Sequence, residues 1–287
     1  MSSQPAPTTF TPWKWPLTSK DHFPALALNE VHIWRSRLDA PPSILAQLQS
    51  YLSEDEQARA ARFRFEHHRH HFIVGRGMLR VILGQYAQQQ PQDLEFAYGD
   101  RGKPFLVNPD SRSQGSQKNS GSHSTILQFN VSHSGGVALY AIALHRQVGI
   151  DLEEIRSMPN ASQLAQRFFT QKEHAQLLAQ PLSQQEQAFF RGWTRKEAYL
   201  KATGEGLGGL ESVEVSLLPH QPPKLQAIEQ PSAETREGKN ETHATKTIEW
   251  YIQDIPLDTN HMAAVVFEVK RMDGSQDSIR FFQVAIP

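Results

Sequence analysis

The order of helical and strand-like segments constrains the fold of this chain more than any other feature. Apolar residues recur at helical spacing from about residue 66 to 86 and again from 183 to about 203. Short runs that alternate apolar and polar residues follow each of these stretches. Helices placed between groups of antiparallel strands are typical of the α+β class, so we expect an α+β fold.

We expect a flexible N-terminal segment over residues 1–24, an N-terminal half over 25–145 and a C-terminal half over 146–287. Each half then holds one long helical stretch and several strands, although no residue-level repeat is visible. The first residues lack the basic start and apolar stretch of a secretory signal. The longest apolar run, Val137–Leu144, is far shorter than the roughly 20 residues that cross a bilayer. We therefore expect a cytoplasmic protein without a membrane span.

Composition excludes several classes of site. The 287 residues include no cysteine, which rules out disulfides, thiolate catalysis and cysteine-based metal centres. Lys and Arg total 29 and Asp and Glu total 30, for a formal net charge of −1. Such a balance gives no general attraction to nucleic acid or to an anionic membrane, and we expect neither as a partner. An anionic ligand must be bound by a local cluster of cations.

Local signals set the expected helix boundaries. Three Ser/Thr-x-x-Glu patterns predict helix starts with reciprocal capping, at Ser53/Glu56, Thr170/Glu173 and Ser183/Glu186. Gly75 and Gly77 lie inside the first long helix, where each costs about 1 kcal/mol relative to Ala. Either a neighbouring element or a ligand is therefore expected to approach that helix closely.

The segment Gly149–Ile155 carries the clearest sign of chemistry. Side chains alternate along a strand, so Asp151 and Glu153 project from one face about 7 Å apart while Ile150 and Leu152 face the core. Two carboxylates in one site repel each other unless a cation or a proton intervenes, and oxygen ligands favour magnesium. The alternative is a solvated strand end with ordinary acidic residues.

A second group of candidate site residues lies on the helix expected from residue 183 to about 203. Trp193, Glu197 and Lys201 are spaced four residues apart and share one face, with Lys196 beside Glu197. Glu197 could complete a magnesium site while Lys196 or Lys201 meets phosphate oxygens. The alternative is an exposed helix whose Glu–Lys pair contributes about 0.3–0.5 kcal/mol.

Two glycine-containing segments suggest different roles. The strand and turn Phe129–Gly136 could bring backbone N–H groups, Ser132 and His133 to a phosphate, although a lone histidine is more often structural. Gly204–Gly209 matches the dinucleotide pattern G-x-G-x-x-G. A helix precedes it where that pattern needs a strand, so Gly204 is better explained as a helix terminator. No site is assigned to the histidine run His67–His71.

Together these segments resemble the 4′-phosphopantetheinyl transferases of the surfactin-synthetase-activating (Sfp) type. The motifs that carry the resemblance are Gly75-Arg-Gly-x-Leu-Arg80, Gly102-Lys-Pro104, Asn130-x-Ser-His-Ser134, Gly149-Ile-Asp-x-Glu153 and Trp193-x-x-Lys-Glu197-x-x-x-Lys201. They follow the family's order between about Ser53 and Leu207. The polar segments 108–124 and 227–246 depart from the family's pattern and are expected to be surface insertions.

The resemblance implies a fold and a reaction. The fold would be a pseudo-dimer of two similar α/β halves with antiparallel sheets, acting as a monomer, with coenzyme A in the cleft between the halves. The phosphopantetheine arm of coenzyme A would move to a serine hydroxyl of an apo acyl or peptidyl carrier protein, releasing adenosine 3′,5′-bisphosphate. Fatty-acid, polyketide, glycolipid and nonribosomal peptide systems all supply such carriers, and the sequence does not choose among them.

The resemblance also implies roles for individual residues. Asp151, Glu153 and Glu197 would hold Mg²⁺ against the pyrophosphate. Lys201 would contact phosphate oxygens and steady the leaving group, while either Glu197 or a water on the metal would take the serine proton. The side chains expected to bind coenzyme A are Arg76, Lys103, Ser132, His133, Lys196 and Lys201, with Lys103 and His133 nearest the 3′-phosphate.

Two other functions stay open from the sequence. One is a magnesium-dependent phosphohydrolase that uses the same carboxylates and no carrier protein. The other is a non-catalytic module that binds coenzyme A or a nucleotide. Arg59, Arg62 and Arg64 are candidates for docking an acidic carrier.

Overall fold

The computed structural model describes residues 9–17, 23–107, 127–218, 225–227, 248–270 and 276–286. The expected surface insertion 108–124 and most of the polar segment 227–246 lie outside these ranges. No helix in the described part of the chain is long and apolar enough to cross a membrane.

The helices and strands follow one another in the expected alternation. The helices are α1 (Pro42–Ser50), α2 (Glu54–Ala61), α3 (Glu66–Ala87), α4 (Ala161–Phe168), α5 (Gln171–Leu178) and α6 (Leu182–Thr203), with short 3₁₀ helices η1 (Pro91–Asp93) and η3 (Leu207–Ser212). The strands are β1 (Thr11–Lys14), β2 (Glu30–Arg37), β3 (Phe96–Tyr98), β4 (Pro104–Leu106), β5 (Leu127–Ser134), β6 (Val137–Leu144), β7 (Val148–Glu154), β8 (Val213–Val215), β9 (Leu225–Ala227), β10 (Trp250–Asp254), β11 (His261–Glu268) and β12 (Ser278–Ala285).

Two sheets hold most of the strands. The larger has the order β1-β12-β2-β6-β5 and the smaller has the order β10-β11-β7. The expected α+β content with antiparallel sheets is confirmed, except that β12 runs parallel to both β1 and β2. Residues 11–14 fall within the segment expected to be flexible, and they form β1. The strand β12 belongs by sequence to the C-terminal half but lies in the sheet of the N-terminal half.

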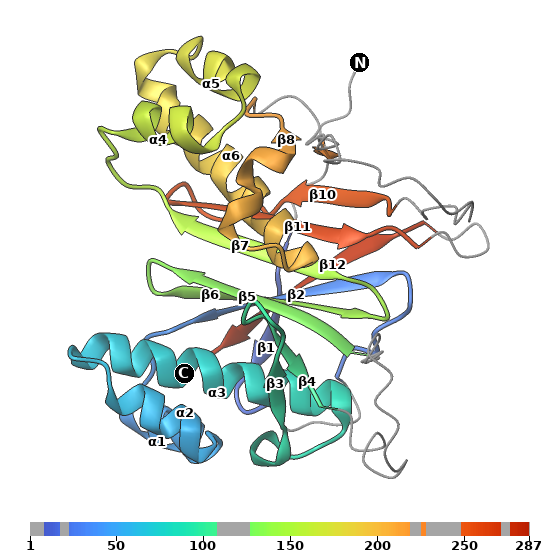
Figure 1. Cartoon of the computed structure of the whole chain (residues 1–287). Coiled ribbons are helices and arrows are strands. Elements are labelled where there is room, and N and C mark those ends of the chain that lie inside the picture. The colour runs from blue at the N-terminus through green and yellow to red at the C-terminus, as the bar shows by residue number, and fades with distance from the viewer. Residues whose placement is uncertain are drawn as a thin grey trace.

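The elements stack as four layers, helices outside and sheets inside (Figure 1). Helices α1–α3 cover the outer face of the larger sheet, and α4–α6 cover the outer face of the smaller one. A third apolar cluster, which includes Ile33, Ala141, Ile150 and Val265, joins residues of both sheets. The two sheets therefore pack face to face, which brings the edge strand β5 beside the edge strand β7.

The expected helix boundaries are confirmed at two of the three capping patterns. The Glu56 carboxylate accepts a hydrogen bond from the Ser53 N–H at 3.1 Å, and the Glu173 carboxylate accepts one from the Thr170 N–H at 2.7 Å. The third pattern was wrong, because α6 begins at Leu182. Its Glu186 carboxylate accepts a hydrogen bond from the Met158 N–H at 2.8 Å, which ties α6 to the segment before α4.

Glycines in both halves permit close contacts between elements. A Cβ added at Gly77 would collide with Leu48 of α1, which explains why a glycine stands at this position of α3. A Cβ added at Gly149 of β7 would collide with the Ala198 carbonyl oxygen and the Ala202 nitrogen of α6. Helix α6 therefore lies with its backbone directly against β7, and this contact places the Glu197–Lys201 turn over Asp151. As predicted, Gly204 ends α6 with a φ of 78°.

Candidate active site

Polar side chains of β5 form a hydrogen-bonded ladder with the backbone of β7. Each strand is the edge of its own sheet, so the β7 N–H groups that face β5 have no backbone ladder there. Instead, side-chain oxygens of β5 accept hydrogen bonds from these N–H groups. The pairs are Asn130 with Ile150 at 2.9 Å, Ser132 with Leu152 at 3.1 Å and Ser134 with Glu154 at 3.0 Å. This polar ladder fixes the register between the two sheets.

Asp151 lies in the centre of the site, between the polar ladder and α6. Its side chain is buried, and Oδ1 accepts hydrogen bonds from Ser132 Oγ at 3.0 Å and from Lys201 Nζ at 2.6 Å. Its other oxygen, Oδ2, is buried and has no hydrogen-bond partner among the residues that the structure describes. A buried carboxylate oxygen without a donor is costly, so Oδ2 is a natural ligand for a cation.

Glu153 and Glu197 add negative charge at the same place. Burial and the charge of Asp151 raise the pKa of Glu153. Burial, followed by the charge of Asp151, raises the pKa of Glu197 to about 7, and Glu153 adds to that increase. The three carboxylates, called here the carboxylate cluster, therefore lie within electrostatic range of one another, as the sequence predicted.

The carboxylate cluster is not arranged as a finished metal site. Within the described ranges, no three His, Asp or Glu side chains are grouped so that they could hold one ion. Asp151 instead forms an ion pair with Lys201, whose ammonium group partly neutralises it. The orphaned Oδ2 and the hard oxygen donors of Glu153 and Glu197 nonetheless fit a magnesium ion in kind.

The expected phosphate-binding side chains Lys201 and Ser132 lie at the carboxylate cluster. Lys201 Nζ donates to Ser132 Oγ at 3.1 Å as well as to Asp151, and its side chain is partly exposed. Ser132 is buried, and its hydroxyl already contacts Asp151, Lys201 and the Leu152 N–H. The structure thus gives Ser132 a role that the sequence did not suggest, which is to hold Asp151 and Lys201 together.

Lys103 reaches the start of β7 from the turn between β3 and β4. Its Nζ donates to the Ala202 carbonyl at 2.8 Å and to the Val148 carbonyl at 3.3 Å. Burial lowers the pKa of Lys103 to about 8, with no carboxylate to counter that effect. Its third contact is with Oε1 of the exposed Gln147 at 3.3 Å, which an anion can displace. A half-buried ammonium group that contacts only neutral oxygens is suited to bind an anion.

Arg76 and His133 lie on opposite sides of this region. The Arg76 guanidinium forms an ion pair with Glu56, donates to Tyr98 Oη at 3.3 Å and lies 4.0 Å from the centre of the Phe96 ring. His133 is exposed on β5, where burial of its ring, then the charges of Lys201 and His71, lower its pKa. His133 therefore lies within electrostatic range of Lys201.

Lys196 does not belong to the site, so its predicted contact with coenzyme A is wrong. Its side chain is fully buried on the other face of α6. The ammonium group donates to Leu210 and Val213 carbonyls at 2.7 and 2.6 Å and pairs with Glu173 at 2.8 Å. An ammonium group has three N–H bonds, so Lys196 has no donor left for a phosphate.

Sequence reasoning also missed the support behind Arg76. Glu56, predicted only as a capping residue, is buried and pairs with both Arg76 and Arg80. Arg80 is buried as well, and it donates to the Pro91 and Leu94 carbonyls at 2.9 and 3.0 Å. The i, i+4 spacing of the two arginines on α3 is the signal from which one shared carboxylate could have been expected.

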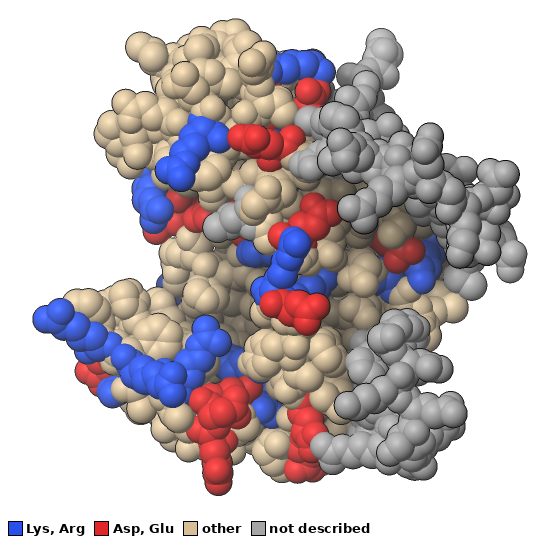
Figure 2. Space-filling model, viewed as in Figure 1, with Lys and Arg blue, Asp and Glu red and all other residues tan. Residues whose placement is uncertain are grey.

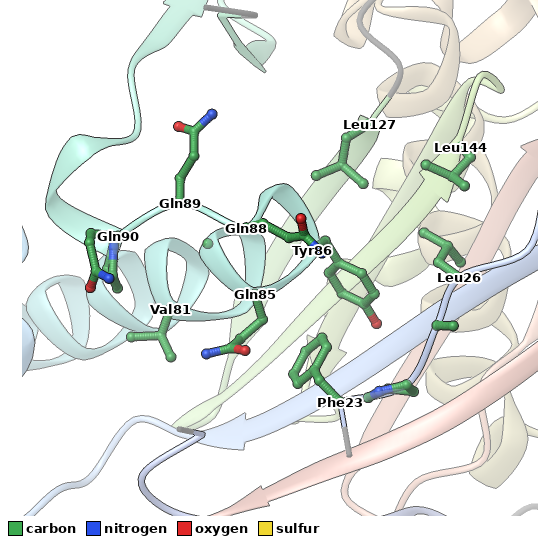
Figure 3. Close-up of a pocket in the computed structure, with 14 residues that line it drawn as sticks. Phe23, Leu26, Val81, Gln85, Tyr86, Gln88, Gln89, Gln90, Leu127 and Leu144 are labelled. Atoms are coloured by element: carbon green, nitrogen blue, oxygen red, sulfur yellow. The ribbon is translucent and has the colours of Figure 1, made fainter. Parts of the chain in front are cut away.

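A separate cavity of about 550 Å³ lies at the end of α3 (Figure 3). Its lining comes from the segment 23–26, the residues 81–91 and the strand ends Leu127 and Leu144. Among the described residues, the lining includes four glutamines and Tyr86 but no Lys, Arg, Asp or Glu. Without a cation it offers no hold on phosphates, so we assign the chemistry to the carboxylate cluster.

A carboxylate cluster bordered by lysines has the charged groups that phosphoryl transfer requires. Comparison with known proteins makes the class specific. Residues 147–264 match the family model described as the 4′-phosphopantetheinyl transferase superfamily, and residues 39–145 match the one described as 4′-phosphopantetheinyl transferase, N-terminal. The chain belongs to the 4′-phosphopantetheinyl transferases.

Individual relatives carry the same enzyme name. The chain is 46% identical to 4′-phosphopantetheinyl transferase HetI of Nostoc sp., over 70% of this chain and 80% of the relative. It is 33% identical to 4′-phosphopantetheinyl transferase psf-1 of Bacillus pumilus, over 58% and 65% of the two chains. It is 28% identical to 4′-phosphopantetheinyl transferase Sfp of Bacillus subtilis, over 58% and 67%. The family is thus confirmed, whereas the Sfp subtype named from the motifs is not.

Proposed function

We propose that this enzyme transfers the 4′-phosphopantetheine arm of coenzyme A to a serine of apo acyl or peptidyl carrier proteins. The observation that carries the proposal is the meeting of Asp151, Glu153, Glu197 and Lys201 where α6 packs on β7. The serine oxygen bonds to the phosphorus of the phosphopantetheine arm. The bond from that phosphorus to the leaving oxygen breaks, which releases adenosine 3′,5′-bisphosphate.

The carboxylate cluster is proposed to hold Mg²⁺ through Asp151, Glu153 and Glu197. The support is the unpartnered buried oxygen of Asp151 together with the mutual repulsion that raises the pKa of Glu153 and Glu197. The ion would supply neutralisation of the pyrophosphate charge. For this arrangement the Lys201 ammonium group shifts from Asp151 toward a phosphate oxygen, where it steadies the leaving group.

The remaining chemistry is assigned to side chains of this chain. A serine hydroxyl is neutral at physiological pH, so a nearby base must take its proton during attack. We assign that role to Glu197. Lys103 and His133 would bind the 3′-phosphate, with Arg76 and Ser132 completing the phosphate contacts. Lys103 is well suited because its ammonium group has no carboxylate partner within the described ranges.

Several finer features are part of the same proposal. The helix-sheet-sheet-helix layers support a pseudo-dimeric arrangement of two halves with coenzyme A between them. Such an arrangement provides both walls of the cleft from one chain and supports a monomeric enzyme. Membership of the Sfp type and a cytoplasmic location complete the proposal.

A mass-spectrometric assay tests the proposal directly. Purified protein with Mg²⁺ and coenzyme A should add about 340 Da to an apo carrier protein, the mass of the transferred arm. Glu197→Gln should slow this transfer by about 100-fold or more, because general-base catalysis contributes at least that much. The matched control is Glu211→Gln, which changes an exposed carboxylate and should keep the wild-type rate.

Other outcomes would contradict the proposal. If phosphate is released from nucleotides while no carrier in a broad panel gains mass, the enzyme is a phosphohydrolase. Tight coenzyme A binding without turnover, unaffected by Asp151→Ala and Glu197→Ala, would instead identify a binding module.

A further inference from the structure

Large aromatic side chains lie exposed where α2 meets α3. Phe63 and Phe65 are 36% and 53% exposed, although side chains of this size are usually buried. Together with the surrounding arginines they form one surface, called here the basic aromatic patch and made up of Arg59, Arg62, Phe63, Arg64, Phe65 and Arg69. Arginine and phenylalanine are enriched at the buried centres of protein interfaces.

The arginines of the basic aromatic patch keep their charge available. Within the described residues, no ion pair links Arg59, Arg62 or Arg64 to a carboxylate, and Arg69 has only a 3.8 Å contact with Glu66. The Arg59 and Arg64 guanidinium groups lie over the rings of Phe72 and Phe65, at 5.3 and 5.5 Å from the ring centres. Figure 2 shows blue Lys and Arg side chains gathered over α2 and the beginning of α3.

The basic aromatic patch is connected to the neighbourhood of Lys103 by a hollow in the surface. A hollow of about 760 Å³ begins at Arg59, Arg62 and Phe63 and extends to Gly102, beside Lys103. Helix α3 continues from the patch to His71, whose charge lowers the pKa of His133 on β5. A partner seated on the patch therefore has a short path to the phosphate-binding side chains.

We propose that the basic aromatic patch docks the carrier protein, through an acidic surface of the carrier that also presents apolar side chains. This inference rests on the proposed function, because the carrier is the macromolecule that must bring a serine to the carboxylate cluster. Four arginines attract acidic groups, while Phe63 and Phe65 require an apolar counterpart. A long polyanion such as RNA fits less well, since Glu54, Asp55 and Glu66 flank the patch.

Charge reversal tests the docking surface in steady-state transfer kinetics. The double variant Arg62→Glu/Arg64→Glu should raise the KM for the apo carrier by about tenfold or more, because it replaces attraction by repulsion. The KM for coenzyme A should stay at the wild-type value. Phe65→Ser should raise the carrier KM as well, and that increase should persist at high salt, which screens charges but not apolar contacts.

The matched control is Arg167→Glu on α4. Its guanidinium also lies over a neighbouring ring, 5.0 Å from the centre of Phe168, but in the other half of the molecule. This control should keep the wild-type KM for the carrier. An equal increase in carrier KM for the control and for the double variant would overturn the docking surface, because the effect would then reflect net charge alone.

The result also separates this inference from the proposed function. If the wild-type protein modifies carriers and the double variant has an unchanged carrier KM, the docking surface is wrong and the transferase function stands. If the wild-type protein modifies no carrier, the proposed function itself fails. Circular dichroism melts of the double variant exclude misfolding as the cause of a raised KM.

Discussion

Lys196 and Glu197 are neighbours on α6, yet they point into opposite environments. Lys196 lies in a saturated network, in which the ammonium group makes three contacts and both Glu173 oxygens accept hydrogen bonds. Glu197 faces two other carboxylates, one of which has a buried oxygen without a partner. Burial of charge alone therefore does not mark function.

The two environments differ in whether the protein itself neutralises the buried charge. The network around Lys196 needs nothing from outside, so it stabilises the packing of α6 against α5 and β8. The carboxylate cluster carries excess negative charge that only a cation or protons can relieve. A site that is electrostatically incomplete in the protein is one that a ligand completes.

The largest effect on stability is expected when the cation of the saturated network is removed. Lys196→Met should lower the free energy of unfolding by about 3–5 kcal/mol, because Glu173 is left as an uncompensated buried charge. Urea denaturation measures the change. The control Lys172→Met removes a 64% exposed ammonium group paired with Glu214 and should cost less than about 1 kcal/mol. Equal losses of unfolding free energy in the two variants would show that the buried network stabilises the protein no more than the exposed ion pair does.

Removing the negative charge of Glu197 should instead stabilise the protein. Because Glu197 has a pKa of about 7 in the folded protein and an ordinary value of 4.5, its ionisation on folding is unfavourable. The contribution of Glu197 to the free energy of unfolding is therefore fully present below pH 4.5, where the group is protonated in both states. This contribution is lost as the pH rises through 7. With a chelator present, Glu197→Gln should therefore be more stable than wild type by about 1–2 kcal/mol at pH 8, after allowance for solvent screening.

The pH dependence gives this prediction its control. The advantage of Glu197→Gln should shrink toward zero near pH 5, where wild-type Glu197 is protonated in the folded state. A variant that is less stable than wild type at pH 8 would mean that the carboxylate cluster is satisfied within the protein.

The smallest effect is expected at the polar ladder that joins the two sheets. Ser132→Ala removes the acceptor of the Leu152 N–H and a donor to Asp151, so unfolding should become easier by about 1 kcal/mol. If Ser132 positions Asp151 and Lys201, the transfer rate should fall while the KM for coenzyme A stays constant. A raised KM for coenzyme A would instead support a direct phosphate contact. The control is Ser134→Ala, which removes the neighbouring hydrogen bond of the polar ladder at a half-buried position.

Periodicity in the sequence predicted the elements that build the site. Alternation in the segment after Gly149 correctly placed Ile150 and Leu152 in the core, both of them now buried between the sheets. The four-residue spacing of Glu197 and Lys201 predicted that both lie on one face of α6, and both interact with Asp151. Their proximity to Asp151 was implied by the family resemblance and not by the spacing. These predictions hold because each depends on one element whose periodicity is fixed by backbone geometry.

The misplaced residue shows where such reasoning stops. Lys196 precedes Glu197 by one residue, which turns it about 100° around the helix, so the two could not both face one ligand. The contact that holds Lys196 depends on Glu173 from another helix, and no local pattern reports it. Pairing between distant strands is equally invisible, because alternation gives the buried face of β12 but not its neighbours.

The position of β12 has a consequence for how the chain is made. This strand pairs with β2 on one side and β1 on the other, and its Phe282 packs among the residues of the N-terminal core. The strand that begins near residue 30 therefore cannot form its pairing with β12 until the residues near position 280 have been synthesised. During synthesis β1 and β2 are made long before β12, the strand that fills the gap between them.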